Sequence, residues 1–490
     1  MVCILNMKLM RHIYLIFFFL QLFESYSQNT FEFLIKTDRD ENPADVIEDA
    51  VGNFFLIGKR VQWYPFEEKG LLVKVSSDGK ILDEREFGNS DTANNFFTVY
   101  NYMKDSIIIM GGSGESTLTK ILMLKADNNL NSFIKYDYVI PPDDIIGDLH
   151  SLINSKNDII ISGMSYNTET LQDLFFYKIS MYGDSLCSVF YPQDNMQWAY
   201  DMLELKGNIG YKVFAFGIFN SSLTVSNIID LDTNFNILSV DSLPHTINQN
   251  NCAEWLSDTT YLVTGKCDYL NSRNMGLLEL DTSDLLLNEF FTDLNHDTIV
   301  FPGVYQNVDF LSKDNIYFGG TFNVIPNHVP YQNEPSWIEL CNLDSNLNLK
   351  WKKYYGGDAF YFLWALKATQ DGGCIMVSHR YDHNVQYQEC DIHVLKVDEN
   401  GLVTSIPEDK NFKICEVILY PNPGKDIIHI STALKDLMLT FYDMNSRVVL
   451  QKSITHDETT LYAGDLSPGN YVYTFTKDGK KVEEGKWVKE

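Results

Sequence analysis

WKKYYGGDAFYFLWALKATQDGGCIMVSHRYDHNVQYQECDIHVLKVDENG, residues 351–401, contains one copy of the unit from which most of this chain is built. Short alternating or fully apolar runs, such as Cys374 to Ser378, are separated by turn residues, such as Asp371 to Gly373. No run has the period of an amphipathic helix, and short runs between turn signals are typical of antiparallel strands. The unit is therefore about four antiparallel strands long.

Two markers of this unit recur through the chain. The first is an apolar run that ends in Gly or Ser: residues 54–58, 107–111, 159–163, 213–217, 261–265, 316–319 and 374–378. The second marker is one reference position in the alternating strand that follows, which we call the pivot. Successive pivots are 49 to 63 residues apart, and they are Lys74, Lys125, Lys178, Asp230, Glu279, Asn342 and Lys396. Two independent markers that recur together at a similar spacing indicate a repeat array.

A period of about 50 residues with four strands per unit predicts the blades of a β-propeller, because a ring of sheets buries both faces of each sheet. The seven copies predict seven blades within residues 28–407. The Gly at the end of the apolar run predicts a bulge or a close backbone approach. Residues 30–36 form a strand without a partner in their own unit, and we expect this strand to complete the last blade and close the ring. The pattern resembles the tandem β-propeller repeats of secreted bacterial proteins, which is informative about fold and not about function.

The first 27 residues have the features of a signal peptide. Lys8 and Arg11 precede an apolar run over residues 13–23, and small residues around Ser27 offer a cleavage site. We therefore expect export through the periplasm to the cell surface or medium, with no transmembrane segment in the mature chain. The formal net charge of −28 disfavours nucleic acid and anionic membranes as partners. Cysteines are scattered without a C-x-x-C pair, which is not the pattern of a disulfide framework, and the sequence assigns no pairing.

The sequence contains no H-E-x-x-H, no G-x-S-x-G and no phosphate-binding glycine loop, which are common catalytic and metal-binding motifs. The Asp/Asn turns that begin at Asp127, Asp232, Asp344 and Asp398 could ligate calcium, but we favour ordinary turn chemistry. We interpret the acidic cluster from Asp38 to Asp45 as solvated surface, and His379 and His383 as loop residues rather than metal ligands. No cofactor, metal or catalytic residue is predicted.

The repeat ends near residue 407, and a second module follows a linker over residues 408–412. Residues 413–490 contain about seven short alternating strands, which predicts a small β-sandwich with an immunoglobulin-like outline. Its motifs are Tyr-Pro-Asn-Pro at 420–423, Leu-x-x-Gly-x-Tyr at 466–471 and Gly-Lys-Trp-Val-Lys at 485–489. The module resembles the type A C-terminal sorting domain of the type IX secretion system. The resemblance implies that the secretion machinery is a partner, and that the domain is usually removed after outer-membrane passage.

Three functional interpretations remain open. The leading one is an exported propeller without enzymatic activity that displays a binding face. The alternative is a surface hydrolase that acts on glycans or peptides in the propeller mouth, and the third is a structural component without a ligand. An enzyme should place two or three carboxylates together on one channel face, whereas a binding module should present aromatic and amide side chains.

The candidate binding residues come from the loops between the Gly-ended strand and the pivot strand. These loops emerge on one face, and the three longest belong to blades six, seven and one, which are neighbours in a closed ring. We expect an aromatic platform for a sugar or an extended peptide, although loops also vary in length without function. Replacing Trp63, Tyr331 and Tyr381 together should then abolish binding and leave the melting temperature nearly unchanged. The platform residues are Trp63, Tyr64, Phe66, His328, Tyr331, Trp337, Tyr381, His383 and Tyr387.

Overall fold

The structure is a computed structural model that describes residues 29–115, 117–140, 145–166, 173–191, 197–219, 223–243, 247, 249–269, 272–292, 299–325, 329, 331–385, 389–403, 414–415 and 417–490. The predicted signal peptide and the predicted linker at 408–412 lie outside these residues. Every regular element among them is a β-strand, which confirms the all-β fold class. Within the same residues there is no helix that is long and apolar enough to span a membrane.

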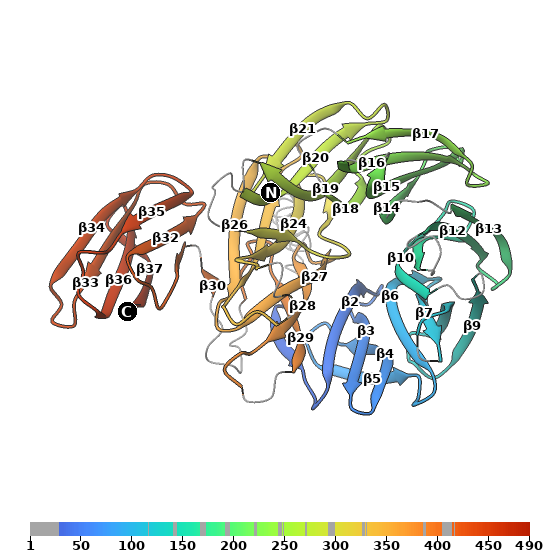
Figure 1. The fold of residues 1–490 in the computed structure, drawn as a ribbon, viewed down its shortest axis with the longest axis horizontal. Helices are drawn as coiled ribbons and strands as arrows, with labels where there is room; N and C mark the ends of the chain where they lie inside the picture. The colour runs from blue at the N-terminus through green and yellow to red at the C-terminus, as the bar shows by residue number, and fades with distance from the viewer. Residues whose placement is uncertain are drawn as a thin grey trace, which may run out of the picture.

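Antiparallel sheets are arranged as a ring around a central axis, with the C-terminal module beside the ring (Figure 1). In most sheets the first strand in sequence is the innermost and the fourth is the outermost. Five of the sheets comprise β2 (Asp40–Glu48), β3 (Phe54–Trp63), β4 (Phe66–Val75) and β5 (Ile81–Phe87); β6 (Ala93–Tyr102), β7 (Ser106–Gly114), β8 (Lys120–Asp127) and β9 (Phe133–Val139); β10 (Ile145–Ile153), β11 (Asp158–Tyr166), β12 (Asp173–Ser180) and β13 (Ser185–Tyr191); β14 (Gln197–Glu204), β15 (Gly210–Phe219), β16 (Leu223–Asp232) and β17 (Ile237–Ser242); β18 (Gln249–Trp255), β19 (Thr260–Tyr269), β20 (Ser272–Asp281) and β21 (Leu286–Phe291).

The next two sheets depart from this simple order. In the first of them the innermost position is split between β22 and β23, which both pair with β24. The second takes its outermost strand from the N-terminus of the chain. Their strands are β22 (Val300–Pro302), β23 (Val308–Ser312), β24 (Asn315–Phe322), β25 (Trp337–Leu343) and β26 (Leu349–Gly356), then β27 (Phe360–Ala368), β28 (Cys374–Tyr381), β29 (Cys390–Val397) and β1 (Phe31–Ile35).

The pairing of β1 with β29 closes the ring, as the sequence predicts. The two strands are antiparallel and in register from Phe31 opposite Lys396 to Ile35 opposite Ile392. Backbone groups at both ends of the repeat region are thereby paired, so the junction has no free strand edge. Phe31 packs in one core cluster with Phe54 and Val377, which joins the first and last sheets.

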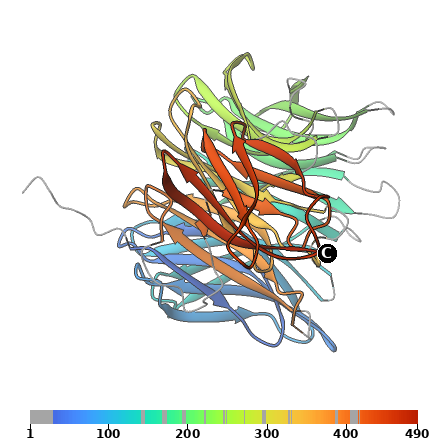
Figure 2. The same ribbon diagram turned by 90° about the vertical axis from the view of Figure 1, so that its left-hand side faces the viewer.

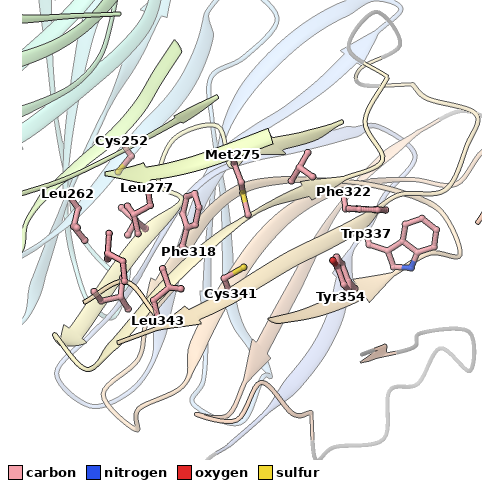
Figure 3. Close-up of a cluster of buried hydrophobic side chains, with 14 of the residues drawn as sticks. Cys252, Leu262, Met275, Leu277, Phe318, Phe322, Trp337, Cys341, Leu343 and Tyr354 are labelled. Atoms are coloured by element: carbon pink, nitrogen blue, oxygen red, sulfur yellow. The ribbon is translucent and has the colours of Figure 1, made fainter. Parts of the chain in front are cut away.

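Each Gly-ended run is the second strand of its sheet, and each pivot residue lies in the third. Phe55 pairs with Lys74, and Ile375 pairs with Lys396, so these two pivots occupy equivalent positions. Neighbouring sheets cover both faces of the second strand, which is why its apolar residues are consecutive rather than alternating. Figure 3 shows such a core between the β18–β21 sheet and the next, where Leu277, Phe318 and Cys341 meet.

The predicted link between the Gly and a bulge is confirmed. The register of β2 against β3 shifts between Pro43 and Asp45, directly opposite Gly58. A Cβ atom at Gly58 would lie 2.1 Å from the carbonyl oxygen of Asn42, and one at Gly111 would lie 2.2 Å from that of Asn95. Only glycine fits this close approach, and the bulge bends the innermost strand and redirects its side chains.

The C-terminal module has its own core between two sheets. One sheet has the order β31 (Val417–Tyr420), β32 (Ile427–Thr432), β35 (Glu458–Tyr462), and the other has the order β34 (Val448–Ile454), β33 (Leu437–Tyr442), β36 (Gly469–Lys477), β37 (Lys480–Lys489). Trp487, from the terminal motif, is fully buried against Phe441 and Tyr471. Its indole Nε1 donates a hydrogen bond to the Pro421 carbonyl, which ties the last strand to the opening motif.

The module contacts the ring along β26, the outer strand of the β22–β26 sheet (Figures 1 and 2). The short strand β30 (Ile414–Cys415) pairs with Tyr354 and Tyr355. The Tyr420 ring packs at 5.4 Å from Phe322, and the Tyr354 hydroxyl lies 2.9 Å from the Ser431 hydroxyl. The Tyr-Pro-Asn-Pro motif at 420–423 is therefore anchored in an aromatic core that the module shares with the ring.

Candidate functional site

Three chain segments that are far apart in sequence meet at one buried carboxylate, that of Asp40. Its Oδ2 accepts hydrogen bonds from Trp63 Nε1 at 2.5 Å and from the Tyr331 hydroxyl at 3.0 Å. Its Oδ1 accepts the backbone N–H of Cys390 at 2.9 Å. Trp63 ends β3, Tyr331 lies between β24 and β25, and Cys390 begins β29. The structure thus brings together the three long loops that the sequence predicts to be neighbours.

The aromatic side chains around Asp40 are exposed. Their exposed fractions range from 38% for Tyr331 and 47% for Phe66 to 55% for Trp63 and 93% for Tyr64. The Trp63 and Phe66 rings are 6.0 Å apart. We call Trp63, Tyr64, Phe66 and Tyr331 the aromatic face. Monomeric proteins seldom expose large aromatic groups together without a use for them, so this surface is a candidate for recognition.

Two predicted platform residues are not part of this surface. Trp337 is 9% exposed and packs against Phe322 and Tyr420, whereas Tyr381 is fully buried beneath Tyr331, with their ring centroids 5.4 Å apart. The prediction that they present area to a ligand is wrong because β25 begins at Trp337 and β28 extends through Tyr381. Both residues therefore belong to strands that are packed inside the fold rather than to loops.

The remaining platform residues lie elsewhere or are not described. His383 is half-buried and lines a cavity of about 720 Å³ at the junction with the C-terminal module, together with Trp337, Tyr420 and Asn422. His328 and Tyr387 lie outside the described residues.

The acidic cluster at Asp38–Asp45 is not solvated surface, contrary to expectation. Asp40, Glu41 and Asp45 are all buried. Glu41 Oε1 accepts a hydrogen bond from Arg60 Nε at 2.7 Å, and Asp45 Oδ2 accepts one from the backbone N–H of Val99 at 3.0 Å. Each buried carboxylate has specific donors, which offset the cost of removing its charge from water.

The Asp/Asn turns follow the predicted turn chemistry. Asp232 Oδ1 accepts the backbone N–H groups of Asn234 and Asn236, both at 2.8 Å, and Asp344 does the same with Asn346 and Asn348. These carboxylates cap the turn that they begin. Among the described residues, no group of three or more His, Cys, Asp or Glu side chains is placed to hold a metal ion.

The second candidate site is a chamber inside the ring, which sequence reasoning missed. Residues 303–307, between β22 and β23, cross the channel, and Tyr305 lies in the channel centre. Its ring contacts Phe97, His150 and Trp364 at centroid distances of 6.2, 5.6 and 5.5 Å. The Tyr305 N–H donates to the Trp364 carbonyl at 2.9 Å, which fixes the segment on β27. Beside it is a cavity of about 630 Å³.

Carboxylates from the innermost strands line this chamber and join neighbouring sheets. Asp45 accepts the Val99 N–H, and Asp201 accepts the Ala253 N–H at 2.8 Å. Asp309, on β23, does not line the chamber itself but makes the same kind of bond, because it accepts the Ala368 N–H at 2.7 Å. Burial raises the pKa of Asp45 and of Asp201 to about 6, although the backbone donors act in the opposite direction.

Glu254, Lys367 and His150 complete the chamber. Burial, reinforced by Asp309 and Asp201, raises the pKa of Glu254 to about 7, although Lys367 opposes the shift. Burial lowers the pKa of Lys367, but the carboxylates of Asp309, Glu254 and Asp45 outweigh it and raise that pKa above its usual range. Burial lowers the pKa of His150 to about 4, so its imidazole is neutral at pH 7.

A repeat alignment could have indicated these channel residues only in part. Asp45, Asp201 and Asp309 lie 13, 16 and 10 residues before the Gly of their own repeat. The Gly does not hold one register position: Asp45 pairs with Ile57, one residue before Gly58, whereas Asp201 pairs with Phe214, three residues before Gly217. Aligning the repeats on the Gly therefore does not bring the acidic residues into register.

The comparisons with known proteins identify the C-terminal module. Residues 418–490 match the family described as the secretion system C-terminal sorting domain. This match supports the resemblance to type IX sorting domains and indicates secretion to the outer surface or beyond. Together with the ring of sheets, it defines a secreted β-propeller protein that is sorted by the type IX secretion system.

The ring also resembles solved β-propeller structures at low identity. The β-propeller domain of the Trilobed protease from Pyrococcus furiosus is 10% identical, with 75% of this chain and 99% of that chain covered and a TM-score of 0.42. Drosophila Semaphorin 2a is 7% identical, with 94% and 97% covered and a TM-score of 0.47. A protein of unknown function from Dyadobacter fermentans is 9% identical, with 75% and 98% covered and a TM-score of 0.44. With these scores, none of the likenesses bears on function. A search of the curated proteins finds no match.

Proposed function

We propose that this protein is a surface-displayed binding protein, in which a propeller presents the aromatic face to a glycan or an extended peptide. The observation that carries the proposal is the convergence of three distant loops on Asp40, which holds Trp63 and Tyr331 in place while both stay exposed. Aromatic side chains with fixed polar tips supply contact area with little loss of side-chain freedom on binding.

The architecture in this proposal is a propeller of seven blades. The sheets β2–β5, β6–β9, β10–β13, β14–β17, β18–β21, β22–β26 and β27–β29 with β1 support that number. A signal peptide over residues 1–27 starts export, the propeller occupies residues 28–407, and the sorting domain, an immunoglobulin-like sandwich, occupies residues 413–490. Its two facing antiparallel sheets support the sandwich assignment.

The binding function is tested by probing the purified protein on glycan and peptide arrays. We expect a ligand that the wild type binds and that a Trp63→Ala, Tyr331→Ala double variant does not bind. Tyr182→Ala is the matched control, because Tyr182 is 80% exposed on the turn between β12 and β13. Equal binding by the double variant would overturn the proposal. Tyr381 is left unchanged because its replacement would test packing rather than recognition.

The delivery route is tested by deleting residues 413–490. We expect the truncated chain to accumulate in the periplasm with a folded propeller, because the ring closes through β1 and β29 without the module. Surface display of the truncated chain would contradict the role of the module as the address. Fractionation measures the location, and circular dichroism measures the fold.

Hydrolysis in the channel is the second candidate function. Glu254, with a pKa of about 7, could exchange a proton near neutral pH, and other carboxylates surround it. Two of them, Asp45 and Asp201, are each held by two backbone N–H donors, their own neighbour's and one from the next sheet. This engagement favours a structural role. Turnover of glycan or peptide substrates that Glu254→Gln abolishes would establish the hydrolase instead.

A further inference from the structure

We propose that the channel chamber, lined by Asp45, His150, Asp201, Glu254 and Lys367, binds a small organic cation that carries more than one amino group, such as a linear polyamine. This site is distinct from the aromatic face. Turns between first and second strands line one end of the chamber. The second strand β3 starts after the equivalent turn of its own sheet and ends at Trp63, so the two sites lie at opposite ends of the ring.

The chamber has one blocked end and one open end. Tyr305 and its contacts with Phe97, His150 and Trp364 occupy the channel centre. The other end is lined by turn residues, Ser155 and residues 205–208, between first and second strands. A volume of about 630 Å³ suits a small elongated molecule rather than a folded partner.

The charges of the chamber favour a cation. Four carboxylates line it, those of Asp45, Asp201, Glu204 and Glu254. Of its two lysines, Lys367 is already paired with Asp309 at 3.4 Å and Lys206 with Asp258 at 3.3 Å. The walls therefore carry uncompensated negative charge once these groups ionise. Burial raises the pKa values of Asp45, Asp201 and Glu254, the nearby charge of Asp309 adds to the shift for Asp45 and Glu254, and a bound ammonium group would relieve this cost.

His150 supplies the second, independent indication of a ligand. It is 6% exposed, lines the chamber, and has ring contacts with Tyr200 and Tyr305. Within the described part of the chain, neither of its ring nitrogens has a hydrogen-bond partner. A neutral imidazole that lines the chamber can accept a hydrogen bond from an ammonium N–H.

The spread of the acidic groups distinguishes an organic cation from a metal ion. They come from β2, β14 and β18, on different sheets, and no three His, Cys, Asp or Glu side chains of the described residues converge at metal-binding distances. A flexible polyamine can instead place successive amino groups against successive carboxylates. Tyr100 and Tyr305 also line the chamber, and an aromatic ring attracts a cation that sits over its face.

The test is isothermal titration of the full chain with spermidine at pH 8 and low salt. We expect saturable binding that Glu254→Gln weakens about tenfold or more, because a charge-assisted hydrogen bond is lost. Asp314→Asn is the matched control, because it removes the same charge from an exposed turn between β23 and β24 on the same face of the ring, away from the chamber lining. We expect it to leave the affinity unchanged.

Each other outcome contradicts the proposal. Equal weakening by the two variants would show nonspecific attraction to an acidic protein, and an absence of binding by the folded wild type would remove the site. If Glu254→Gln alters the circular dichroism spectrum, His150→Phe provides the second variant, and unchanged spermidine affinity in that variant would also overturn the proposal. Binding of a neutral oligosaccharide in the chamber in place of spermidine would assign another ligand class.

Discussion

Asp40 and Asp45 lie on the same strand, β2, but they organise opposite ends of the ring. Asp40 takes its hydrogen bonds from two aromatic side chains and one backbone group on three distant segments. Asp45 takes its bonds from two backbone groups, on its own strand and on the next sheet. One residue type therefore builds two surfaces. Side-chain donors around Asp40 leave aromatic rings facing outward, whereas backbone donors around Asp45 leave negative charge facing the channel.

The difference explains why the two ends suit different ligands. Exposed aromatic rings at the loop end favour binding of sugars or peptides because they offer a large contact area. Carboxylates in the enclosed channel act in a medium of lower dielectric constant, where an opposite charge is attracted more strongly than in water. Substitutions in and around the two sites test this difference, and the one at Tyr381 should affect stability most.

Tyr381→Ala should cause the largest loss of stability, about 3–5 kcal/mol in the free energy of unfolding, because it empties a fully buried aromatic position. Denaturant unfolding measures this loss. Tyr182→Ala, at an exposed turn, should change the free energy by less than about 0.5 kcal/mol. A small effect of Tyr381→Ala would show that Tyr381 belongs to the surface after all.

Asp201→Asn should alter the pH dependence of stability. The pKa of Asp201 is about 6 in the fold and about 4 in an unfolded chain, so the folded state holds this proton more tightly. The stabilisation is fully present below pH 4 and is lost as the pH rises through 6. Replacing the group removes this loss, on the order of 3 kcal/mol.

The measurement for Asp201→Asn is a series of unfolding curves for wild type and variant between pH 4 and pH 7.5. The stability advantage of the wild type over the variant should shrink across this range. The exposed Asp258→Asn variant should keep a constant difference from the wild type. A difference for Asp201→Asn that stays constant with pH would contradict the raised pKa of the Asp201 carboxyl.

Asp40→Ala should cost about 1–3 kcal/mol, because the buried Cys390 N–H loses its acceptor. It should also release Trp63 and change the tryptophan fluorescence. Asp38→Ala is the matched control, since Asp38 is exposed and lies two residues away. Equal effects of the two changes would mean that Asp40 does not organise the loops.

Trp63→Ala should have the smallest effect on stability, less than about 1 kcal/mol, because more than half of the side chain is already in water. A large drop in melting temperature would indicate that Trp63 supports the fold rather than a ligand. Thermal unfolding of the variant beside Tyr182→Ala measures the difference.

Much of the architecture could be predicted from the sequence because it depends on local patterns. Apolar runs ending in Gly and pivots such as Lys74 mark the second and third strands, since the same packing recurs in each sheet. The strand around Phe31 could be assigned to the last sheet because it lacked a partner of its own. The sorting module was recognisable because its motifs, including Trp487, occupy fixed core positions.

The sites were less predictable because they depend on tertiary placement. The lengths of the loops correctly predicted that Trp63 and Tyr331 lie close together. A residue at a loop boundary can nevertheless belong to a buried strand, as Tyr381 does. In the sequence, acidic residues such as Asp45 look like surface residues. It is the bulge in the innermost strand that directs their side chains toward the channel. Their donors are backbone groups of the next sheet, which sequence does not mark.

The most direct test of the aromatic face is a calorimetric titration with the ligand found on the arrays. Wild type, Trp63→Ala with Tyr331→Ala, and Glu254→Gln are compared at one pH and salt concentration. We predict that the aromatic double variant loses at least about tenfold in affinity, as expected for removal of central aromatic contacts, while Glu254→Gln binds like the wild type. Loss of binding by Glu254→Gln with full binding by the aromatic double variant would contradict the account.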